Sequence, residues 1–322
     1  MKTKLTDILP IDYPIIMAPM FLITNVEMIV ASLESGITGC IPALNFRTTE
    51  ELAKALKEIK ARSKKPFGVN LIVNKSNVHY KKQLHTCLDN GVDYFITSLG
   101  SPEETIRESK KNGTKVFCDV IDELYARKVE GLGADGVIAV NSGAGGHLGN
   151  IPATVLVPML KKACKVPVIS AGGIGSGAGI IAMLALGADG VSIGSPFIAT
   201  NEAPISDEYK KACVEFGAED IVMTDKISGS RCTAINTPYL KKIGINQNFV
   251  ESFLNSNKQV KKYAKMLTYY RGMKLLEKAA FGASYKSVWV AGTSIEFTEK
   301  IEPLKDIVAR YVKEMDETRK LL

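Results

Sequence analysis

Eight short apolar runs recur along residues 1–200, and polar segments with helical periodicity separate them. Their hydrophobicity is nearly continuous rather than alternating, which is typical of parallel strands that are covered on both faces. The spacing therefore predicts repeated βα units. The predicted strands are Pro14–Met20, Ile37–Leu44, Phe67–Val73, Tyr94–Leu99, Lys115–Val120, Gly136–Val140, Pro167–Ala171 and Gly190–Ile193.

An internal repeat groups these units in pairs. Glycine closes a helix well because it adopts the left-handed conformation of a C-cap. The even-numbered strands each follow a helical segment with such a glycine, namely Gly36, Gly91, Gly133 and Gly187. Three of the other runs open on proline, which is tolerated at the first residue of a strand: Pro14, Pro66 and Pro167. A paired unit that recurs four times predicts a closed (β/α)8 TIM barrel in preference to an open doubly wound sheet.

The pattern changes after residue 200, and we expect no further parallel strands before about Trp289. A final amphipathic segment, Phe297–Thr318, has apolar residues at a helical period and would be the eighth barrel helix. We therefore predict a barrel (1–200), a mostly helical insertion between strand 8 and the last barrel helix (201–290), and that helix (291–322). Within the insertion we expect helices at Asp207–Phe216 and Gln259–Lys278, joined by polar links at Ile227–Ala234 and Asn236–Asn248.

Composition and charge narrow the functional class. The chain of 322 residues is 46% hydrophobic and 23% charged, which is ordinary for a soluble enzyme. Without a membrane-spanning run or a signal-peptide pattern, we expect a cytoplasmic protein with no membrane partner. Most of the net charge of +7 comes from lysines on helix-like segments without a basic-aromatic motif. We therefore expect no nucleic-acid partner, although a positive field favours anionic ligands.

The six cysteines are scattered and form no Cys-x-x-Cys pair. Several lie in apolar runs. This pattern indicates buried, reduced thiols and argues against both a metal site and a disulfide framework.

Glycine-rich loops follow three consecutive predicted strands: Asn141–Gly149, Ala171–Gly177 and Gly194–Phe197. A mobile loop tip is one interpretation of such a run. However, the carboxyl ends of barrel strands meet at one face, where such enzymes place their sites. Glycine also lets backbone approach a ligand closely, so Gly145 and Gly146 are candidate binding residues. Three such loops in a row favour one shared ligand site.

The last two of these loops suggest a phosphate site. Barrels often hold phosphate with backbone N–H groups after strands seven and eight and with a helix N-terminus. The helix Ile180–Leu186, preceded by Gly177–Gly179, would point its N-terminus at the anion. The pattern is not the Gly-x-Gly-x-x-Gly fingerprint of dinucleotide-binding proteins. Its absence favours a mononucleotide such as FMN. The candidate residues in these two loops are Ala171, Gly172, Gly173, Gly194 and Ser195.

The first and third strands offer places for a flat ring. Small residues and proline at Ala18, Pro19 and Met20 would let a ring lie against backbone, although a simple strand-to-loop turn explains them nearly as well. Asn70 is polar within an apolar strand. Because a buried amide needs partners, it either braces a neighbouring strand or hydrogen-bonds a ring edge.

His147 is the best catalytic candidate among the three histidines. His79 and His85 lie in a polar helical region, where we expect solvated side chains. Flanking glycines leave His147 with no bulky local packing to satisfy. Its near-neutral pKa suits a general base or a donor to an anionic substrate.

The motifs together resemble the flavin sites of nitronate monooxygenases, formerly called 2-nitropropane dioxygenases. The likeness covers about residues 10–200 and extends more loosely to Gly229–Arg231 and Ala291–Thr293. The Gly-Gly-His-x-Gly motif around His147 is its specific part. The motifs that carry the resemblance are Met17–Met20, Gly68–Asn70, Gly143–Gly149, Ala171–Ile174 and Gly194–Phe197.

This resemblance implies non-covalent FMN, with Ala18, Met20 and Asn70 near the ring. It implies that Gly172, Gly173, Gly194 and Ser195 hold the phosphate. His147 would act on a nitronate, or deprotonate a nitroalkane, and dioxygen would then yield a carbonyl compound and nitrite. Gly194–Phe197 departs from the family, since many relatives have Gly-Thr-Arg-Phe and an arginine near the phosphate.

The same motifs also resemble enoyl-acyl-carrier-protein reductase II, an FMN barrel that uses NAD(P)H, and an NADH:quinone reductase. Acyl carrier protein would be a partner only in the first of these cases. A flavin-binding regulatory module without turnover is a third interpretation, which the intact His147 disfavours. A homodimer is compatible with the architecture, but the sequence carries no direct sign of it.

Overall fold

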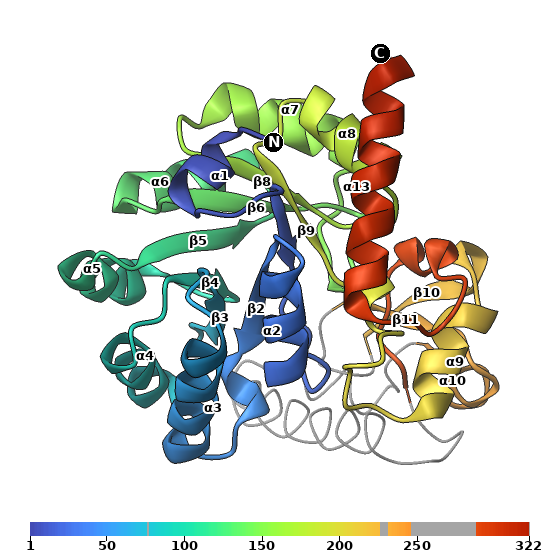
Figure 1. Ribbon diagram of the computed structural model, residues 1–322, viewed down its shortest axis with the longest axis horizontal. Helices are drawn as coiled ribbons and strands as arrows, with labels where there is room; N and C mark the ends of the chain where they lie inside the picture. Colours follow the sequence, from blue (N-terminus) through green and yellow to red (C-terminus); the bar gives the residue numbers. More distant parts are fainter. Residues whose placement is uncertain (76, 226–230, 246–287, 322) are drawn as a thin grey trace, which may run out of the picture.

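Eight parallel strands close into a barrel in the computed structural model, which describes residues 1–75, 77–225, 231–245 and 288–321 (Figure 1). The strand order around the barrel is β1-β2-β3-β4-β5-β6-β8-β9, and every neighbouring pair is parallel, with β9 returning to β1. The predicted (β/α)8 fold is therefore confirmed. The strands are β1 (Ile15–Met17), β2 (Thr38–Pro42), β3 (Gly68–Ile72), β4 (Tyr94–Ser98), β5 (Lys115–Val120), β6 (Gly136–Val140), β8 (Val168–Ala171) and β9 (Gly190–Ile193).

Helices surround the barrel and bury their apolar faces against its outer surface. The predicted helix-ending glycines Gly36, Gly91, Gly133 and Gly187 all have positive φ angles. The helices along the barrel are α1 (Lys4–Ile8), α2 (Val26–Glu34), η1 (Ala43–Asn45), α3 (Thr49–Arg62), α4 (Tyr80–Asp89), α5 (Glu103–Asn112), α6 (Glu123–Leu132), α7 (Ala153–Ala163), α8 (Gly177–Ala185) and η2 (Ser195–Phe197).

The last helix, α13 (Leu304–Leu321), packs against α8 and α2 and so takes the eighth position in the helical ring (Figure 1). The predicted start at Phe297 was wrong, because η4 (Thr293–Phe297) and an extended segment precede the helix. In that segment, the backbone of Glu302 pairs with that of Thr200 in an isolated parallel β-bridge. Proline at position 303 disfavours a helical conformation for the residue before it, so the helix begins only afterwards.

The barrel interior changes from apolar to polar along its axis. Helix α1 closes the amino end, where its Leu5 and the following residue Leu9 belong to the same apolar cluster as inward side chains such as Ile16 and Phe117. At the carboxyl ends of the strands the inward positions include Asn70, Ser98 and Asp119. The barrel therefore presents polar side chains at the carboxyl ends of its strands.

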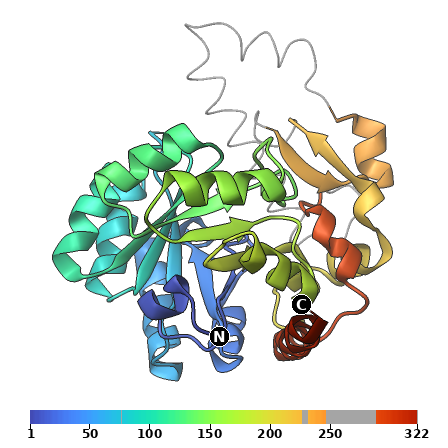
Figure 2. The same ribbon diagram turned by 90° about the horizontal axis from the view of Figure 1, so that it is seen from above.

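A three-stranded antiparallel sheet lies beside the barrel, in the order β10-β11-β7, and is seen from a second side in Figure 2. Its strand β7 (Gly146–His147) comes from the glycine-rich loop after β6. The elements of the insertion within the described residues are α9 (Asp207–Glu215), η3 (Ala218–Asp220), β10 (Ile221–Thr224), β11 (Cys232–Ile235) and α10 (Pro238–Ile243).

The structure corrects the two predicted links of the insertion. The segment Ile227–Ala234 contains most of β11, and Asn236–Asn248 contains α10. Pairing with β7 and β10 stabilises β11, and such non-local pairing leaves little local signal. Helix α9 agrees with the predicted Asp207–Phe216, whereas Gln259–Lys278 lies outside the described residues. The division into 1–200, 201–290 and 291–322 stays a prediction.

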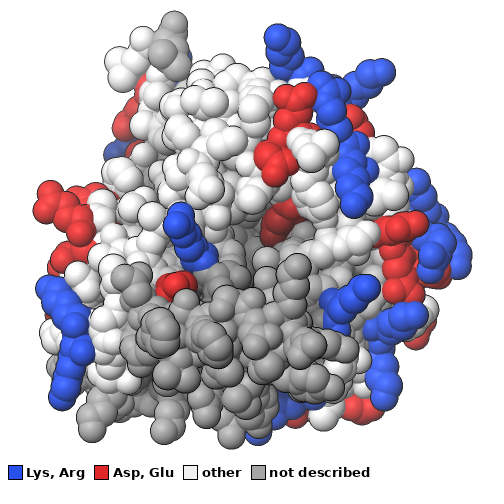
Figure 3. Space-filling view, turned by 180° about the vertical axis from the view of Figure 1, so that it is seen from behind, with Lys and Arg blue, Asp and Glu red and all other residues white. Residues whose placement is uncertain are grey.

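The cysteines and two of the histidines lie in the environments that the sequence predicted. All six cysteines are free and buried, and His79 and His85 are exposed, as predicted. Among the described residues, no helix combines the length and apolar character needed to cross a bilayer. Within the same residues, no three potential metal ligands cluster. Basic and acidic side chains lie interspersed along the edges of the face in Figure 3.

Candidate functional site

A cavity of about 1270 Å³ opens at the carboxyl end of the barrel. Barrel residues form its floor, and residues from the insertion, such as Tyr209 and Val288, contribute to its wall. All of the binding and catalytic residues predicted from the sequence line this one cavity, so the structure brings the full set together. They are Ala18, Pro19, Met20, Asn70, Gly145, Gly146, His147, Ala171, Gly172, Gly173, Gly194 and Ser195.

The cavity floor is asymmetric. Small residues line one side, where the nearest atoms to a carbon added at Gly194 would be those of Ala18 and Met20, at 3.5–3.6 Å. Asn70, Ser98 and Asp119 make the other side polar. A flat ring can therefore lie against backbone on the first side while its edge meets polar groups on the second.

Backbone amides on the small side are available to an anion. Gly172, Gly173 and Gly194 all line the cavity. Their N–H groups donate no hydrogen bond to any residue that the structure describes. N–H groups that face a cavity without a partner in the protein can donate to a ligand there, so this cluster fits a ligand that brings acceptor oxygens, such as a phosphate.

The loops after β6 and β8 are locked together through Asn141. Its side chain donates to the Gly172 carbonyl at 2.9 Å and accepts from the Gly143 amide at 2.7 Å. Gly172 has a φ of +113°, and a carbon added there would lie 2.4 Å from the Ala144 nitrogen. The packing of the two loops therefore requires glycine at position 172, whether or not a ligand is bound.

The predicted helix N-terminus at the phosphate is wrong. Helix α8 begins at Gly177, earlier than the predicted Ile180, with Ser176 as its N-cap. The Gly177 amide donates to Glu314 of α13 at 2.5 Å, and the Gly179 amide donates to Ser176. The α8 N-terminus is therefore neutralised by a carboxylate of this chain, because α13 packs against α8.

Asn70 braces the neighbouring strand, which is the first of its two predicted roles. Its amide donates to the Ile96 carbonyl at 3.0 Å and to Ser98 Oγ at 2.8 Å. Both amide hydrogens are thus used. Asn70 Oδ1 accepts no hydrogen bond from the described residues, so it can still accept one from a ring edge.

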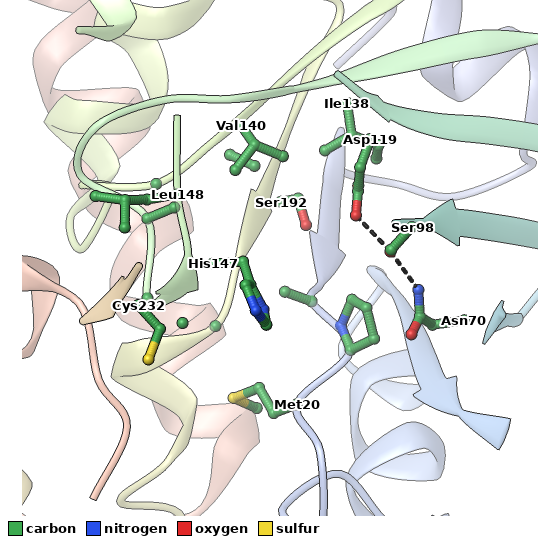
Figure 4. A pocket seen from close by; sticks show the side chains of 18 of the residues that line it. Met20, Asn70, Ser98, Asp119, Ile138, Val140, His147, Leu148, Ser192 and Cys232 are labelled. Carbon is green, nitrogen blue, oxygen red and sulfur yellow. Dashed lines mark hydrogen bonds between the residues drawn. The ribbon is translucent and has the colours of Figure 1, made fainter. Parts of the chain in front are cut away.

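The chain of hydrogen bonds continues to a residue that the sequence analysis missed. Ser98 Oγ donates to Asp119 Oδ2 at 2.5 Å, so Asn70, Ser98 and Asp119 are linked across β3, β4 and β5 (Figure 4). Burial raises the pKa of the Asp119 carboxyl to about 6, although the Ser98 hydrogen bond opposes this change. The signal was present in the sequence, since Asp119 interrupts an apolar strand as Asn70 does.

His147 enters the cavity from the sheet beside the barrel. In β7 it pairs with Cys232 of β11, and its side chain points into the cavity (Figure 4). The residue is exposed to the cavity, yet surrounding protein lowers the pKa of its imidazole below the ordinary 6.5. The neutral form, which can accept a proton, is therefore favoured at neutral pH.

Thr233 of β11 holds the backbone of the His147 loop. Its hydroxyl accepts from the Gly146 amide at 3.0 Å and donates to the Ala144 carbonyl at 3.1 Å. The sequence gave no indication of this contact, because 87 residues separate Thr233 from Gly146. Thr233 thus fixes the backbone next to His147, although it does not itself line the cavity.

Replacing Thr233 by valine is expected to lower the free energy of unfolding by about 1–3 kcal/mol, because two backbone groups lose their partner. Urea unfolding measures this change. Thr86→Val is the matched control, since the Thr86 hydroxyl forms no hydrogen bond with the described residues. Equal stability of the two variants would contradict the bracing role of Thr233.

The segment 288–294, which precedes α13, contributes Val288, Val290 and Ser294 to the cavity wall. Ser195 Oγ accepts from the Gly292 amide at 2.8 Å, and Trp289 stacks on Tyr209 with ring centroids 5.5 Å apart. The Tyr209 hydroxyl donates to the Val290 carbonyl at 2.6 Å. Ser195, the last of the predicted phosphate residues, is thus held by a segment 97 residues later in the chain.

Comparison with protein families matches this chain to the model described as nitronate monooxygenase, over residues 2–82 and 76–314. A curated relative in Staphylococcus haemolyticus, a probable nitronate monooxygenase, is 29% identical over 288 residues, covering 74% of this chain and 80% of the relative. Another, from Mycobacterium tuberculosis, is 29% identical over 246 residues, which cover 76% of this chain and 68% of the relative. It is a (3aS,4S,5R,7aS)-5-hydroxy-7a-methyl-1-oxo-octahydro-1H-indene-4-carboxyl-CoA dehydrogenase.

Two solved structures share the whole architecture. FabK from Thermotoga maritima superposes with a TM-score of 0.87 at 30% identity, covering 100% of this chain and 98% of FabK. A nitroalkane oxidase from Streptomyces ansochromogenes superposes with a TM-score of 0.83 at 24% identity, covering 99% of each chain, and this likeness supports the fold alone.

Proposed function

Because the chain belongs to the nitronate monooxygenase family, we propose that it is an FMN-dependent oxidoreductase that oxidises alkyl nitronates with dioxygen to a carbonyl compound and nitrite. The observation that carries this proposal is the position of His147. A neutral imidazole points into a cavity whose other sides offer a polar rim and backbone N–H groups that have no acceptor among the described residues. This arrangement suits a substrate that loses a proton and becomes an anion.

The residues of the cavity fit FMN. The amides of Gly172, Gly173 and Gly194 would hold the phosphate, and the small residues Ala18 and Gly194 leave room for the ring. Asn70 Oδ1 would accept a hydrogen bond from an N–H at the ring edge. When bound there, FMN would supply the electron acceptor for oxidation of the substrate.

The protein groups would handle the proton and the charge. His147 would accept the α-proton of a nitroalkane and then, as an imidazolium, donate a hydrogen bond to the anion that forms. Thr233 would keep the histidine backbone in place during this exchange. Apolar walls such as Ile138 and Val140 would limit water around the reacting carbon.

An anaerobic visible spectrum of the purified protein tests the proposal. We expect flavin bands that bleach on addition of propyl-1-nitronate and return with dioxygen, while NADH in a parallel sample leaves them unchanged. The absence of flavin would overturn the cofactor assignment. Flavin that NADH bleaches and nitronate does not would overturn nitronate oxidation.

The second outcome would favour the NAD(P)H-dependent alternatives, an enoyl-acyl-carrier-protein reductase or a quinone reductase. One observation favours an elongated apolar substrate. Leu99, Ile121 and Leu124 line the cavity rim, and each is at least 46% exposed. Lys128 lies in the same rim and could bind an anionic group at the far end of such a substrate.

A further inference from the structure

The strongest feature that the proposed chemistry leaves unused is the carboxyl group of Asp119. It occupies the inward position near the end of β5 and lines the cavity into which His147 points from β7 (Figure 4). Deprotonation of a nitroalkane by His147 does not require a carboxylate. A buried carboxyl group is nevertheless costly unless a partner compensates it.

The partners of Asp119 within the protein are incomplete. Ser98 donates to Oδ2, and the same Ser98 accepts from Asn70, so this serine is fixed in orientation. Oδ1 accepts no hydrogen bond from the described residues, and Asp119 forms no ion pair with them. Because Asp119 lines the cavity, its unused oxygen is available to a ligand there.

The electrostatic surroundings of Asp119 favour a donor. The titratable groups that interact with its charge include Cys40 on β2, Cys118 on β5 itself and Tyr125 on α6, and these three carry no charge at neutral pH. Farther along the same cavity lie Lys128, Arg231 and Asp122 at its wall and rim. Apolar Ile96 and Ile138 complete the wall, so a donor in this corner would pair strongly with the carboxylate.

We propose that Asp119, oriented by the Asn70–Ser98 hydrogen bonds, is a specificity residue that binds an O–H or N–H donor of the substrate at the end away from the reacting carbon. The inference deepens the proposed function and rests on it for the place of the reacting group. An ionised Asp119 repels the negative charge of a nitronate, so the substrate lies with its nitronate group toward His147 and with its donor toward β5.

Matched ligands test this assignment by binding. 3-Nitro-1-propanol and 1-nitrobutane differ by a hydroxyl in place of a methyl group, and 3-nitropropylammonium replaces it by a cation. We expect the alcohol to bind the purified protein about tenfold more tightly than nitrobutane, which is typical of a hydrogen bond to a charged group. Tighter binding of the ammonium than of the alcohol would identify the natural donor as a cation, and the reverse order would identify a hydroxyl.

Variants distinguish the contribution of the Asp119 carboxylate to ligand preference from that of the other cavity residues. Asp119→Leu should abolish the preference for the alcohol, and Asp119→Asn, which keeps a neutral acceptor, should reduce it to a few-fold. Asp89→Asn, at an exposed position on α4, should leave it unchanged. An alcohol preference that persists in Asp119→Leu would overturn the proposal.

Carbon-13 NMR of aspartate-labelled protein provides a readout that needs no turnover. The Asp119 carboxyl signal is identified by its loss in Asp119→Asn. The alcohol should lower the titration midpoint of this signal by about one pH unit, since it favours the ionised form, and nitrobutane should not. Equal effects of the two ligands would contradict the assignment. A failure of the proposed nitronate oxidation can be told apart from a failure of the Asp119 assignment. In that case nitronate would not bleach the flavin, but the NMR response to the alcohol would persist.

Discussion

His147→Gln is expected to lower kcat/KM for neutral nitroalkanes by about 10²–10⁴-fold, the usual contribution of a positioned general base. The loss for a preformed nitronate should be smaller, because that substrate has already lost its proton. Glutamine keeps a hydrogen-bond donor in place, and flavin content should therefore not change. Oxygen consumption with each substrate measures the two effects.

The histidine effect should also appear in the pH profile. Burial lowers the pKa of His147 below 6.5, so the neutral base persists to lower pH than for an ordinary histidine. Turnover of neutral nitroalkanes should be constant above that pKa and fall as the pH drops through it. This descending limb should vanish in His147→Gln.

His85→Gln is the matched control, since His85 is exposed on α4, away from the cavity. Its turnover and pH profile should equal those of the wild type. Equal nitroalkane turnover in His147→Gln and His85→Gln would contradict the catalytic assignment.

Asp119→Asn is expected to stabilise the fold at alkaline pH by about 3 kcal/mol, because ionised Asp119 is costly where it lies. Its folded-state pKa is raised from 3.8 to about 6, so the folded protein binds this proton more tightly than the unfolded chain does. The contribution of the proton to stability is complete below about pH 4 and is lost as the pH rises through 6. The variant carries no such charge and should keep its stability over this range.

Urea unfolding at about pH 4.5 and pH 8 checks this sign. The difference between Asp119→Asn and wild type should be small at the lower pH and large at the higher one. Asp89→Asn should show no comparable pH dependence, since its side chain is exposed. A variant less stable than the wild type at pH 8 would mean that the Ser98 bond outweighs the cost of burial.

Local patterns in the sequence determined the barrel and most of its site. Apolar runs set the strands almost residue by residue: β5, β6 and β9 were predicted with their observed bounds. Because parallel strands of a barrel all end at one face, residues after them could be placed in one cavity without knowing any distance. Every predicted site residue lines that cavity for this reason.

Only the tertiary structure decided the interactions between segments far apart in the chain. Glu314 neutralises the helix N-terminus that the glycines of α8 had suggested for phosphate. Thr233 of a strand without a local signal holds the His147 loop. The side-chain amide of Asn70 donates both of its hydrogen bonds to residues of β4, and Ser98 orients Asp119. Such contacts depend on barrel closure and on the packing of the insertion, which local periodicity does not encode.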